Sequence, residues 1–173
     1  MSQPDDQSAP ESTVHPDETA LLQRAVQLAL DNAVAGQLPF GALVVRDGDV
    51  LATGVNTALR DHDPVAHAEV EAIRNACRRL GEVHVTGATV LSSCEPCAVC
   101  HALAAAAGAI RIVYAAPKES IPDLGYPAPP DNDALMVQMQ QALRSAAPHQ
   151  VVYVPTEGAE EPFQRFLANR TLQ

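Results

Sequence analysis

The sequence predicts an α/β domain in which one mixed β-sheet is covered by helices on both faces. Stretches with apolar residues at helical spacing alternate along the chain with short runs rich in β-branched residues. An Asp47-Gly48 pair lies between the first two of these runs and indicates a β-hairpin. The chain has 173 residues, of which 47% are hydrophobic, and this suits one domain with a single core.

The first 18 residues are predicted to be a disordered acidic tail, followed by one domain over 19–173. The tail contains proline and carries five acidic side chains but no lysine or arginine. It has neither the basic nor the apolar region of a secretory signal, so we expect a cytoplasmic protein without a disulfide framework. The longest nearly uncharged apolar run of the chain, 102–110, is far shorter than the roughly 20 residues that cross a bilayer.

The first half of the domain contains two predicted helices around the hairpin. Residues 19–35 form the first helix, because leucine, alanine and valine recur on one face. The hairpin lies within 40–56, and the segment "RDHDP", 60–64, is predicted to be a loop. The second helix covers 67–80, with Gly81 as its C-cap.

The second half alternates strands and helices. Pro96 is predicted to open an alanine-rich helix, because proline fits the first helical turn. A proline-rich stretch after the fourth strand can only be an irregular loop. The elements are predicted in the order strand, helix, strand, loop, helix, strand and helix, over 88–93, 96–108, 110–116, 117–133, 134–147, 149–155 and 162–169.

The motif "SCEPCAVCH", 93–101, permits three interpretations. It contains the attachment pattern of c-type haem, most of an iron–sulfur run, and, in Cys97 and Cys100, half of a zinc site. An iron–sulfur run needs a fourth cysteine three residues on, where Ala104 stands. Covalent haem needs an exported, mostly helical protein, and this chain has no export signal. Zinc is therefore the metal that the sequence favours.

The zinc interpretation is completed by "HAE" at 67–69. Cys97 and Cys100 lie one helical turn apart at a predicted helix start, where both sulfurs face one side and thiolates are favoured. A catalytic zinc site needs a third protein ligand and a base, and His67 and Glu69 supply both. Together the two segments form the H-x-E…P-C-x-x-C signature of zinc nucleobase deaminases.

A structural zinc-binding domain without catalytic activity is the alternative for the same residues. Such a site would need a fourth ligand to close it. Cys94 and Cys77 are the remaining cysteines of the chain and the candidates for that position.

The sequence resembles the cytidine-deaminase-like superfamily, and within it the branch of guanine deaminases and related nucleobase deaminases. The matching stretches include "LPFGALVVRDGDVLATGVN", "HDPVAHAEVEAIRNAC", "SCEPCAVC" and "IRIVYAA", and they cover most of 36–116. The resemblance implies a three-layer α-β-α fold with a mixed five-stranded sheet, and a homodimer. It further implies that His67, Cys97 and Cys100 bind Zn²⁺ and that Glu69 carries protons during catalysis.

The resemblance also implies substrate contacts. Asn56 matches a side chain that hydrogen-bonds the ring of the substrate, and Phe40 matches an aromatic residue that packs on it. Ala68 and Ser93 complete the expected substrate-binding set. Two simpler roles stay open, because Phe40 could fill the core and Asn56 could serve as a turn residue after its strand.

The implied activity is hydrolytic deamination of a free nucleobase or nucleoside with release of ammonia. The net charge of −10 includes −5 from the tail, so the domain also carries −5 and nucleic-acid binding is not expected. Editing of adenosine in tRNA is the alternative activity, since editing deaminases share the motif.

The identity of the ring stays open in the sequence. Guanine is the reference substrate of the branch, but Ser120 stands where the alignment puts a base-reading aspartate, with Asp123 close by. Cytosine, isoguanine and triazine-type rings are therefore candidates as well. The loop 117–130, with Tyr126 as a lid residue, is the expected place of this difference, and His101 is expected beside the ligands or exposed, without binding the metal.

Overall fold

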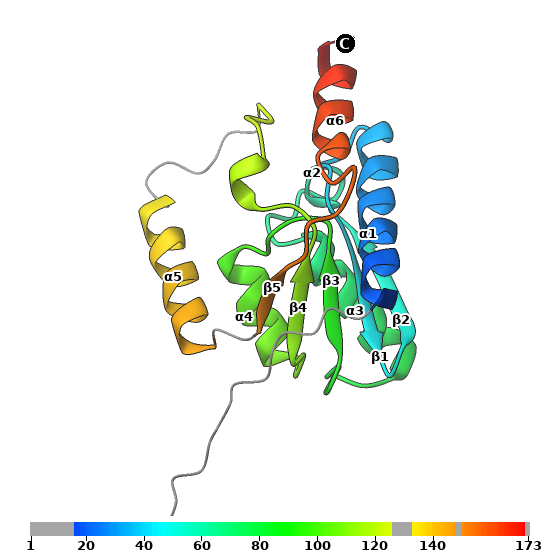
Figure 1. Cartoon of the computed structure of the whole chain (residues 1–173), viewed down its shortest axis with the longest axis vertical. Coiled ribbons are helices and arrows are strands. Elements are labelled where there is room, and N and C mark those ends of the chain that lie inside the picture. The colour runs from blue at the N-terminus through cyan, green and yellow to red at the C-terminus, as the bar shows by residue number, and fades with distance from the viewer. Residues whose placement is uncertain (1–15, 126–132, 148–149, 172–173) are drawn as a thin grey trace, which may run out of the picture.

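The computed structural model describes residues 16–125, 133–147 and 150–171. Its elements follow the predicted order of helices and strands closely (Figure 1). In chain order they are α1 (Pro16–Val34), β1 (Gly41–Arg46), β2 (Asp49–Val55), α2 (Ala58–Asp61), α3 (Ala68–Leu80), β3 (Thr89–Ser92), α4 (Ala98–Ala106), β4 (Arg111–Tyr114), the 3-10 turn η1 (Lys118–Ser120), α5 (Asp133–Ala146), β5 (Val151–Tyr153) and α6 (Glu161–Thr171).

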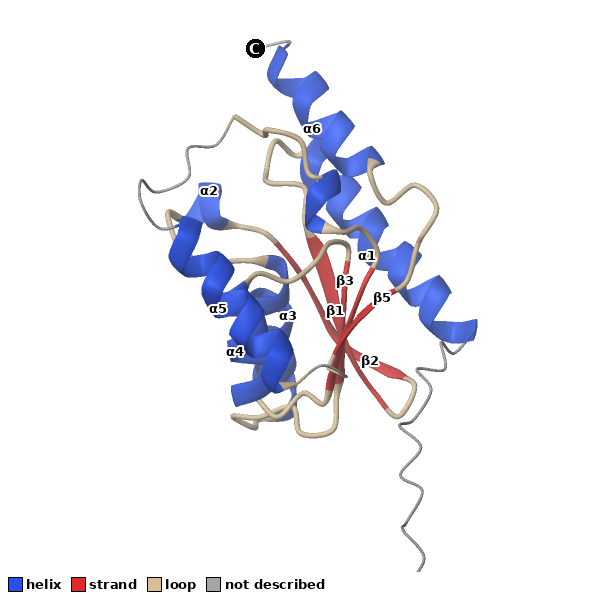
Figure 2. Cartoon of the chain, turned by 60° about the vertical axis from the view of Figure 1, so that its left-hand side comes forward, coloured by secondary structure: helices blue, strands red, loops and turns tan. Residues whose placement is uncertain are grey.

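The five strands form one mixed sheet in the order β2-β1-β3-β4-β5. β1 pairs antiparallel with both β2 and β3, whereas β3, β4 and β5 run parallel. Helices α1 and α6 lie on one side of the sheet, and α3, α4 and α5 lie on the other, with α5 packed outside α4 (Figure 2). The predicted three-layer fold with a mixed five-stranded sheet is confirmed.

The core has two halves, one on each face of the sheet. Alternation along β1 supplies both halves, because Ala42 and Val44 pack toward α3 and α4 while Leu43 and Val45 pack toward α1. All four side chains are buried. Burial of a valine or leucine contributes about 1.5–3 kcal/mol, so these pairs fix which face of β1 meets which helix layer.

The predicted hairpin turn forms at Asp47 and Gly48. Their φ angles are 54° and 84°, and positive φ at both central residues is the geometry of the tight turns that match strand twist. Gly81 likewise ends α3 in a left-handed conformation, with φ of 68°. Both sequence predictions are confirmed.

Helix α1 begins earlier than predicted. The predicted tail covered 1–18, with the helix starting at Thr19, yet α1 starts at Pro16. Proline suits a first helical turn, and Glu18 finds a partner, since its Oε1 lies 2.6 Å from Nη1 of Arg111 in β4. The rest of the predicted tail lies outside the described residues.

The predicted loop over 60–64 is wrong at its start, because the short helix α2 ends within it. Asn56 Oδ1 accepts a hydrogen bond from the N–H of Ala58, and this turn initiates the helix. His62 then ends α2 in a left-handed conformation, with φ of 52°. Helix α2 is too short to show apolar periodicity, and it is started by the polar side chain of Asn56, so the sequence pattern did not predict it.

The described part of the proline-rich loop, up to Gly125, contains only the turn η1 and is otherwise irregular. Tyr126, the expected lid residue, lies outside the described residues. Among the described helices, none combines the length and hydrophobicity that a membrane span requires.

Helix α3 lies directly on the backbone of β2. A Cβ at Gly54 would collide with the backbone N of Ala72 and the backbone O of Ala68. Since Ala68 is the first residue of α3, the missing side chain at Gly54 sets how closely the start of this helix approaches the sheet.

Gly54→Ala is expected to lower the free energy of unfolding by about 2–3 kcal/mol, because the added methyl group must push α3 off the sheet. Urea denaturation monitored by circular dichroism measures this loss. A variant as stable as the parent protein would show that α3 can move away from β2 freely.

Candidate metal centre

Helices α3 and α4 begin close to each other, and their first residues bring the "HAE" and "PCAVC" halves of the motif together. His67 is the N-cap of α3 and Cys97 is the N-cap of α4, and both have extended backbone angles. Helix α4 therefore begins at Ala98, two residues after the predicted start at Pro96. Each helix N-terminus directs partial positive charge toward this point, which favours anionic side chains there.

His67, Cys97 and Cys100 form a nearly equilateral triangle of ligand atoms. His67 Nδ1 lies 3.6 Å from Cys97 Sγ and 3.4 Å from Cys100 Sγ, and the two sulfurs are 3.5 Å apart. Tetrahedral zinc, with bonds of about 2.3 Å to sulfur and 2.0–2.1 Å to nitrogen, separates its ligands by about 3.6–3.8 Å. The three side chains fit a zinc ion.

No fourth ligand closes the site within the described residues, which include all four cysteines. Cys94 is buried and Cys77 half-buried, and neither belongs to the cluster of candidate ligand atoms. Three protein ligands with one open position are the arrangement of catalytic zinc sites, whereas structural sites have four. The structural-zinc alternative therefore lacks the residue that it needs.

Glu69 lies beside the cluster in the first turn of α3 and is buried. Its Oε2 is 3.4 Å from Cys100 Sγ, and its Oε1 accepts a hydrogen bond of 2.8 Å from Ser92 Oγ. Burial raises the pKa of Glu69, and the bond from Ser92 opposes this rise in part. A carboxyl group in these surroundings holds a proton more readily than a free one and can exchange it with a neighbouring group.

Ser92 is a site residue that sequence reasoning missed in favour of its neighbour Ser93. Ser92 lies two residues after Val90 on β3, so both side chains point toward α3 and α4. Ser93 instead accepts a hydrogen bond of 3.0 Å from the N–H of Gly41. Both faces of β3 are buried, so no hydrophobic alternation in the sequence distinguishes the two serines.

The contact between the two thiols shifts their pKa values in opposite directions. The hydrogen bond between the two sulfurs lowers the pKa of Cys97, and the same contact, together with burial, raises the pKa of Cys100. Contact with Cys97 also raises the pKa of His67. At neutral pH, Cys100 therefore holds a proton that zinc must displace.

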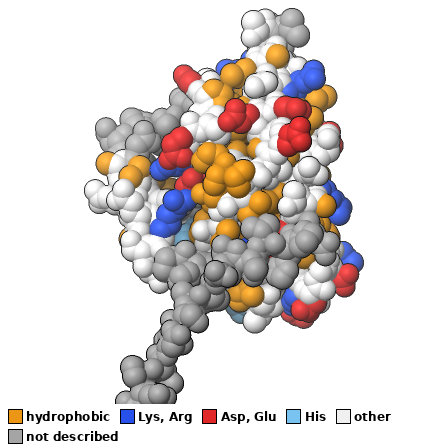
Figure 3. Space-filling model, viewed as in Figure 1, with side chains coloured by type: hydrophobic (Ala, Val, Ile, Leu, Met, Phe, Trp, Pro, Cys, Tyr) orange, Lys and Arg blue, Asp and Glu red, His pale blue; other side chains and the backbone are white. Residues whose placement is uncertain are grey.

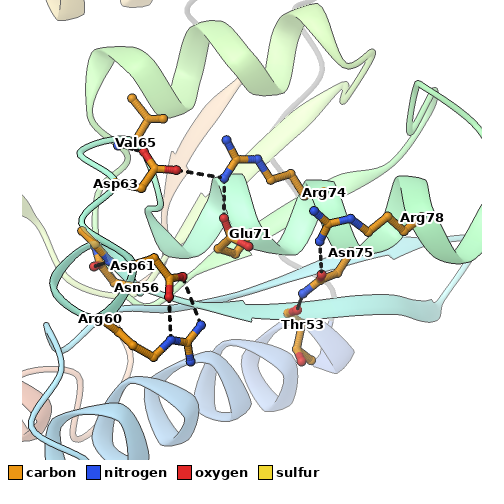
Figure 4. A network of polar contacts seen from close by, with 11 residues as sticks. Thr53, Asn56, Arg60, Asp61, Asp63, Val65, Glu71, Arg74, Asn75 and Arg78 are labelled. Carbon is orange, nitrogen blue, oxygen red and sulfur yellow. Dashed lines mark hydrogen bonds and ion pairs between the residues drawn. The ribbon is translucent and has the colours of Figure 1, made fainter.

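A polar network supports the loop that leads into His67 (Figure 4). Asp63 Oδ1 accepts from the N–H of Val65, and Asp63 Oδ2 lies 3.6 Å from Nη1 of Arg74 on α3. Arg74 also pairs with Glu71 one turn away. The loop is thereby attached to the helix that it precedes, although such half-exposed ion pairs contribute at most about 1 kcal/mol each.

Asn56 and Phe40 have structural partners in addition to their predicted substrate contacts. Asn56 is buried, and because its Oδ1 accepts from the N–H of Ala58, its Nδ2 is the group left to donate to a ring. Phe40 is half-buried, and its ring centroid lies 5.9 Å from that of Phe163. A core role for Phe40 and a turn role for Asn56 are therefore real, and their contact with a substrate stays a prediction.

The remaining predicted residues are buried around the cluster. Ala68, the first residue of α3, is fully buried, and Ser93 ties the end of β3 to β1. Their contact with a substrate also stays a prediction. His101 is only 1% exposed, so the expectation that it lies at the surface is wrong. Its Nε2 lies 3.3 Å from Gln150 Oε1, and it does not belong to the cluster of candidate ligands.

A three-ligand zinc site with a buried acid beside it, on a five-stranded sheet between helices, defines a zinc-dependent hydrolytic deaminase. The model of the family described as cytidine and deoxycytidylate deaminase zinc-binding region matches residues 16–116, more than half of the chain. The chain belongs to this family, and the resemblance seen in the sequence is confirmed.

Relatives with different substrates are similar to this chain. Guanine deaminase of Bacillus subtilis (strain 168) is 41% identical over 106 residues, which are 61% of this chain and 68% of that protein. A tRNA-specific adenosine deaminase of Buchnera aphidicola subsp. Baizongia pistaciae (strain Bp) is 29% identical over 103 residues, which are 60% of this chain and 64% of that protein. The chain thus spans about two thirds of the length of each relative.

A solved structure supports the same fold. The X-ray structure of guanine deaminase from Bacillus subtilis matches with a TM-score of 0.55 and 32% identity, over 71% of this chain and 92% of that chain.

The affinity for zinc is expected to rise with pH, by about tenfold per unit, because binding displaces the proton that Cys100 holds. Below the raised pKa of His67 a second proton must leave, so the dependence should become steeper. Competition with a chromophoric chelator between pH 6 and 8, corrected for the chelator's own protonation, measures this. A flat profile would contradict the protonated thiol.

Proposed function

We propose that the protein deaminates a small aminated ring, a free nucleobase or nucleoside, with guanine as the first candidate. The observation that carries this proposal is the position of Glu69. Its carboxylate lies 3.4 Å from a ligand sulfur, is buried, and has one oxygen held by Ser92. A proton carrier next to an open zinc position is what hydrolysis of an amine on a ring requires.

Glu69 moves protons in two directions during the proposed reaction. A zinc ion held by His67, Cys97 and Cys100 would lower the pKa of a water toward neutrality and so supply the nucleophile. Glu69 Oε2 takes a proton from the attacking water and passes it to the ring nitrogen beside the amine-bearing carbon. A carbon–oxygen bond forms, and after a second proton transfer the carbon–nitrogen bond breaks and ammonia leaves. Water is consumed, and a carbonyl replaces the amine.

Ser92 keeps the two oxygens of Glu69 in different roles. The hydroxyl of Ser92 donates its proton to Oε1. The oxygen of the same hydroxyl accepts a hydrogen bond of 3.4 Å from the N–H of Cys94. Oε1 therefore stays an acceptor, and the mobile proton occupies Oε2 on the side of Cys100.

Guanine is favoured by the similarity to a guanine deaminase at 41% identity. The aspartate expected to read guanine is replaced by Ser120, whose hydroxyl donates to the carbonyl of Pro117 at 2.8 Å. A neutral, already bonded hydroxyl recognises an amino-purine less strongly than a carboxylate does. Isoguanine, cytosine and triazine-type rings therefore remain in the proposed substrate range.

Editing of tRNA is the second candidate, because the relatives include tRNA-specific adenosine deaminases. The net charge of −10 disfavours a polyanionic substrate. On the face drawn in Figure 3, basic side chains are scattered among acidic ones and form no continuous stripe.

A homodimer is part of the proposal, and the groove between α3 and α4 is the surface that a second copy would cover. The groove has a volume of about 510 Å³. Val65, Val83 and Val99 on its walls are 41%, 82% and 36% exposed, which is high for apolar side chains. Val65 precedes His67 by two residues, so a partner there would lie beside the metal centre.

Glu69→Gln is expected to reduce turnover by at least 10²–10⁴-fold while zinc stays bound, because Gln cannot carry a proton. Ammonia release is measured from guanine, isoguanine, cytosine, ammeline, guanosine, cytidine and adenosine, and from tRNA, with zinc content determined for each protein. The control is Glu82→Gln, an exposed acid just beyond α3, which should leave turnover unchanged. Turnover of tRNA alone would replace the small-ring proposal, and an active Glu69→Gln protein would contradict the mechanism.

Leu103→Glu is expected to convert a dimer into a monomer, because it places a charge on the apolar wall of the groove. Light scattering after size-exclusion chromatography gives the mass. Ile110→Glu serves as the control, since Ile110 is 62% exposed and does not line the groove. A parent protein that is monomeric, or a Leu103→Glu protein that stays dimeric, would refute this surface.

A further inference from the structure

The three metal ligands are supported in different ways. His67 is held at the start of α3, and Cys100 lies within α4. Cys97 is the N-cap of α4 and is preceded by the short segment that leaves β3. Its position therefore depends on what fixes the two residues before it, Glu95 and Pro96.

Glu95 is fixed by three contacts. Its side chain is only 4% exposed, and its Oε1 lies 2.6 Å from Nη2 of Arg144 on α5. Its Oε2 accepts from the N–H of Lys118 at 3.2 Å, and its own N–H donates to the carbonyl of Ala116 at 2.8 Å. An ion pair to α5 and two hydrogen bonds to the segment after β4 thus meet at the residue two places before Cys97.

Pro96 is fixed by the same helix. Its carbonyl accepts a hydrogen bond of 2.9 Å from Nε2 of Gln140, which lies one turn before Arg144 on α5. Gln140 is 7% exposed, and its Oε1 has no hydrogen-bond partner among the described residues. An apolar side chain would fill this position without leaving a buried polar atom unpaired, so the bond to Pro96 is what explains a glutamine here.

Helix α5 meets the domain through a face that centres on Gln140. Among its residues whose side chains are described, Gln140 alone is buried, while Met136 and Leu143 on the same face are half-buried. Leu135, Val137 and Met139 are 54%, 43% and 40% exposed, so these three side chains contribute little to attachment. The polar contacts to Glu95 and Pro96 are therefore central to how α5 meets the rest of the domain.

We propose that Gln140 and Arg144 of α5 are positioning residues for the metal ligand Cys97. They act through the Pro96 carbonyl and the Glu95 carboxylate, and we call these four residues the α5 clamp. The clamp holds the chain just before Cys97, so that its sulfur reaches the zinc position before any metal arrives.

The clamp matters because zinc bonds tolerate little error. Distances beyond about 0.2 Å from the usual Zn–S length weaken the site. Without Arg144, the buried carboxylate of Glu95 would lack its cation and would turn toward water, carrying the adjoining backbone with it. Arg144 is 42% exposed, so the direction of its hydrogen bond matters more here than charge attraction across solvent.

The inference rests on the metal site and not on which ring is deaminated. Zinc release can be measured without any substrate, so a failed search for activity leaves the test intact. A failed clamp, in turn, leaves the proposed role of Glu69 untouched.

Arg144→Met and Gln140→Met test the clamp, because methionine keeps much of the volume and removes the donors. Release of zinc from the holoprotein to a chromophoric chelator is expected to be about tenfold faster in each variant, as for other residues that orient ligands. Arg144→Lys keeps one donor and the charge and should restore slow release in part. Where turnover can be measured, kcat should fall more than KM rises.

The matched control is Arg79→Met. Arg79 lies on α3 and donates to the backbone carbonyls of Val50 and Leu51, so the variant also loses arginine-to-backbone bonds. This variant should lose stability without releasing zinc faster. The proposal would be overturned if the parent protein and both α5 variants released zinc at the same rate. It would also be overturned if Arg79→Met, with the same loss of Tm, released zinc as fast as the α5 variants.

Glu95→Gln provides a test that does not depend on the folding of Arg144→Met alone. The uncharged amide of Gln needs no cation beside it. The rate of zinc release from the Glu95→Gln, Arg144→Met double variant should therefore rise by less than the two fold-increases of the single variants multiplied together. Strictly independent effects would show that Glu95 and Arg144 do not act together.

Discussion

The metal centre depends on two helix N-termini that converge beside the C-terminal end of the central strand β3. Helices α3 and α4 lie on the same face, with β3 between them in the chain, and each begins with a ligand as its N-cap. The partial positive charges of both ends favour an anion between them, and the pKa of Cys97 is lowered there. The close contact of α3 with Gly54 and the polar attachment before Cys97 both serve to hold these two ends together.

Burial and hydrogen bonding give neighbouring groups of the site different chemistry. Desolvation raises the pKa of Glu69, while the hydrogen bond between the thiols lowers the pKa of Cys97. Two acidic groups that both contact Cys100 thus have pKa values shifted in opposite directions. One can carry a proton and the other can bind a metal, and the difference comes from which partners each group meets.

The sequence predicts most of what local patterns determine. The spacing of "HAE" and "PCAVC" identified the ligands, and Asp47-Gly48 identified the hairpin, because in each case neighbouring residues suffice. Ser92 was missed because both faces of its strand are buried and alternation carries no signal. The pairing of Glu95 with Arg144 could not be predicted either, since it joins residues 49 positions apart through a crossover whose geometry no short motif encodes.

The route of the chain between β4 and β5 has a consequence for redesign. Everything from Pro117 to α5 belongs to one crossover connection, and Gln140 and Arg144 attach it to the metal loop four residues apart on one helix face. A loop of different length or composition can be grafted ahead of α5 if Gln140 and Arg144 still face Pro96 and Glu95. The composition of this connection and the retention of the metal would then be separable, because a single helical turn joins them.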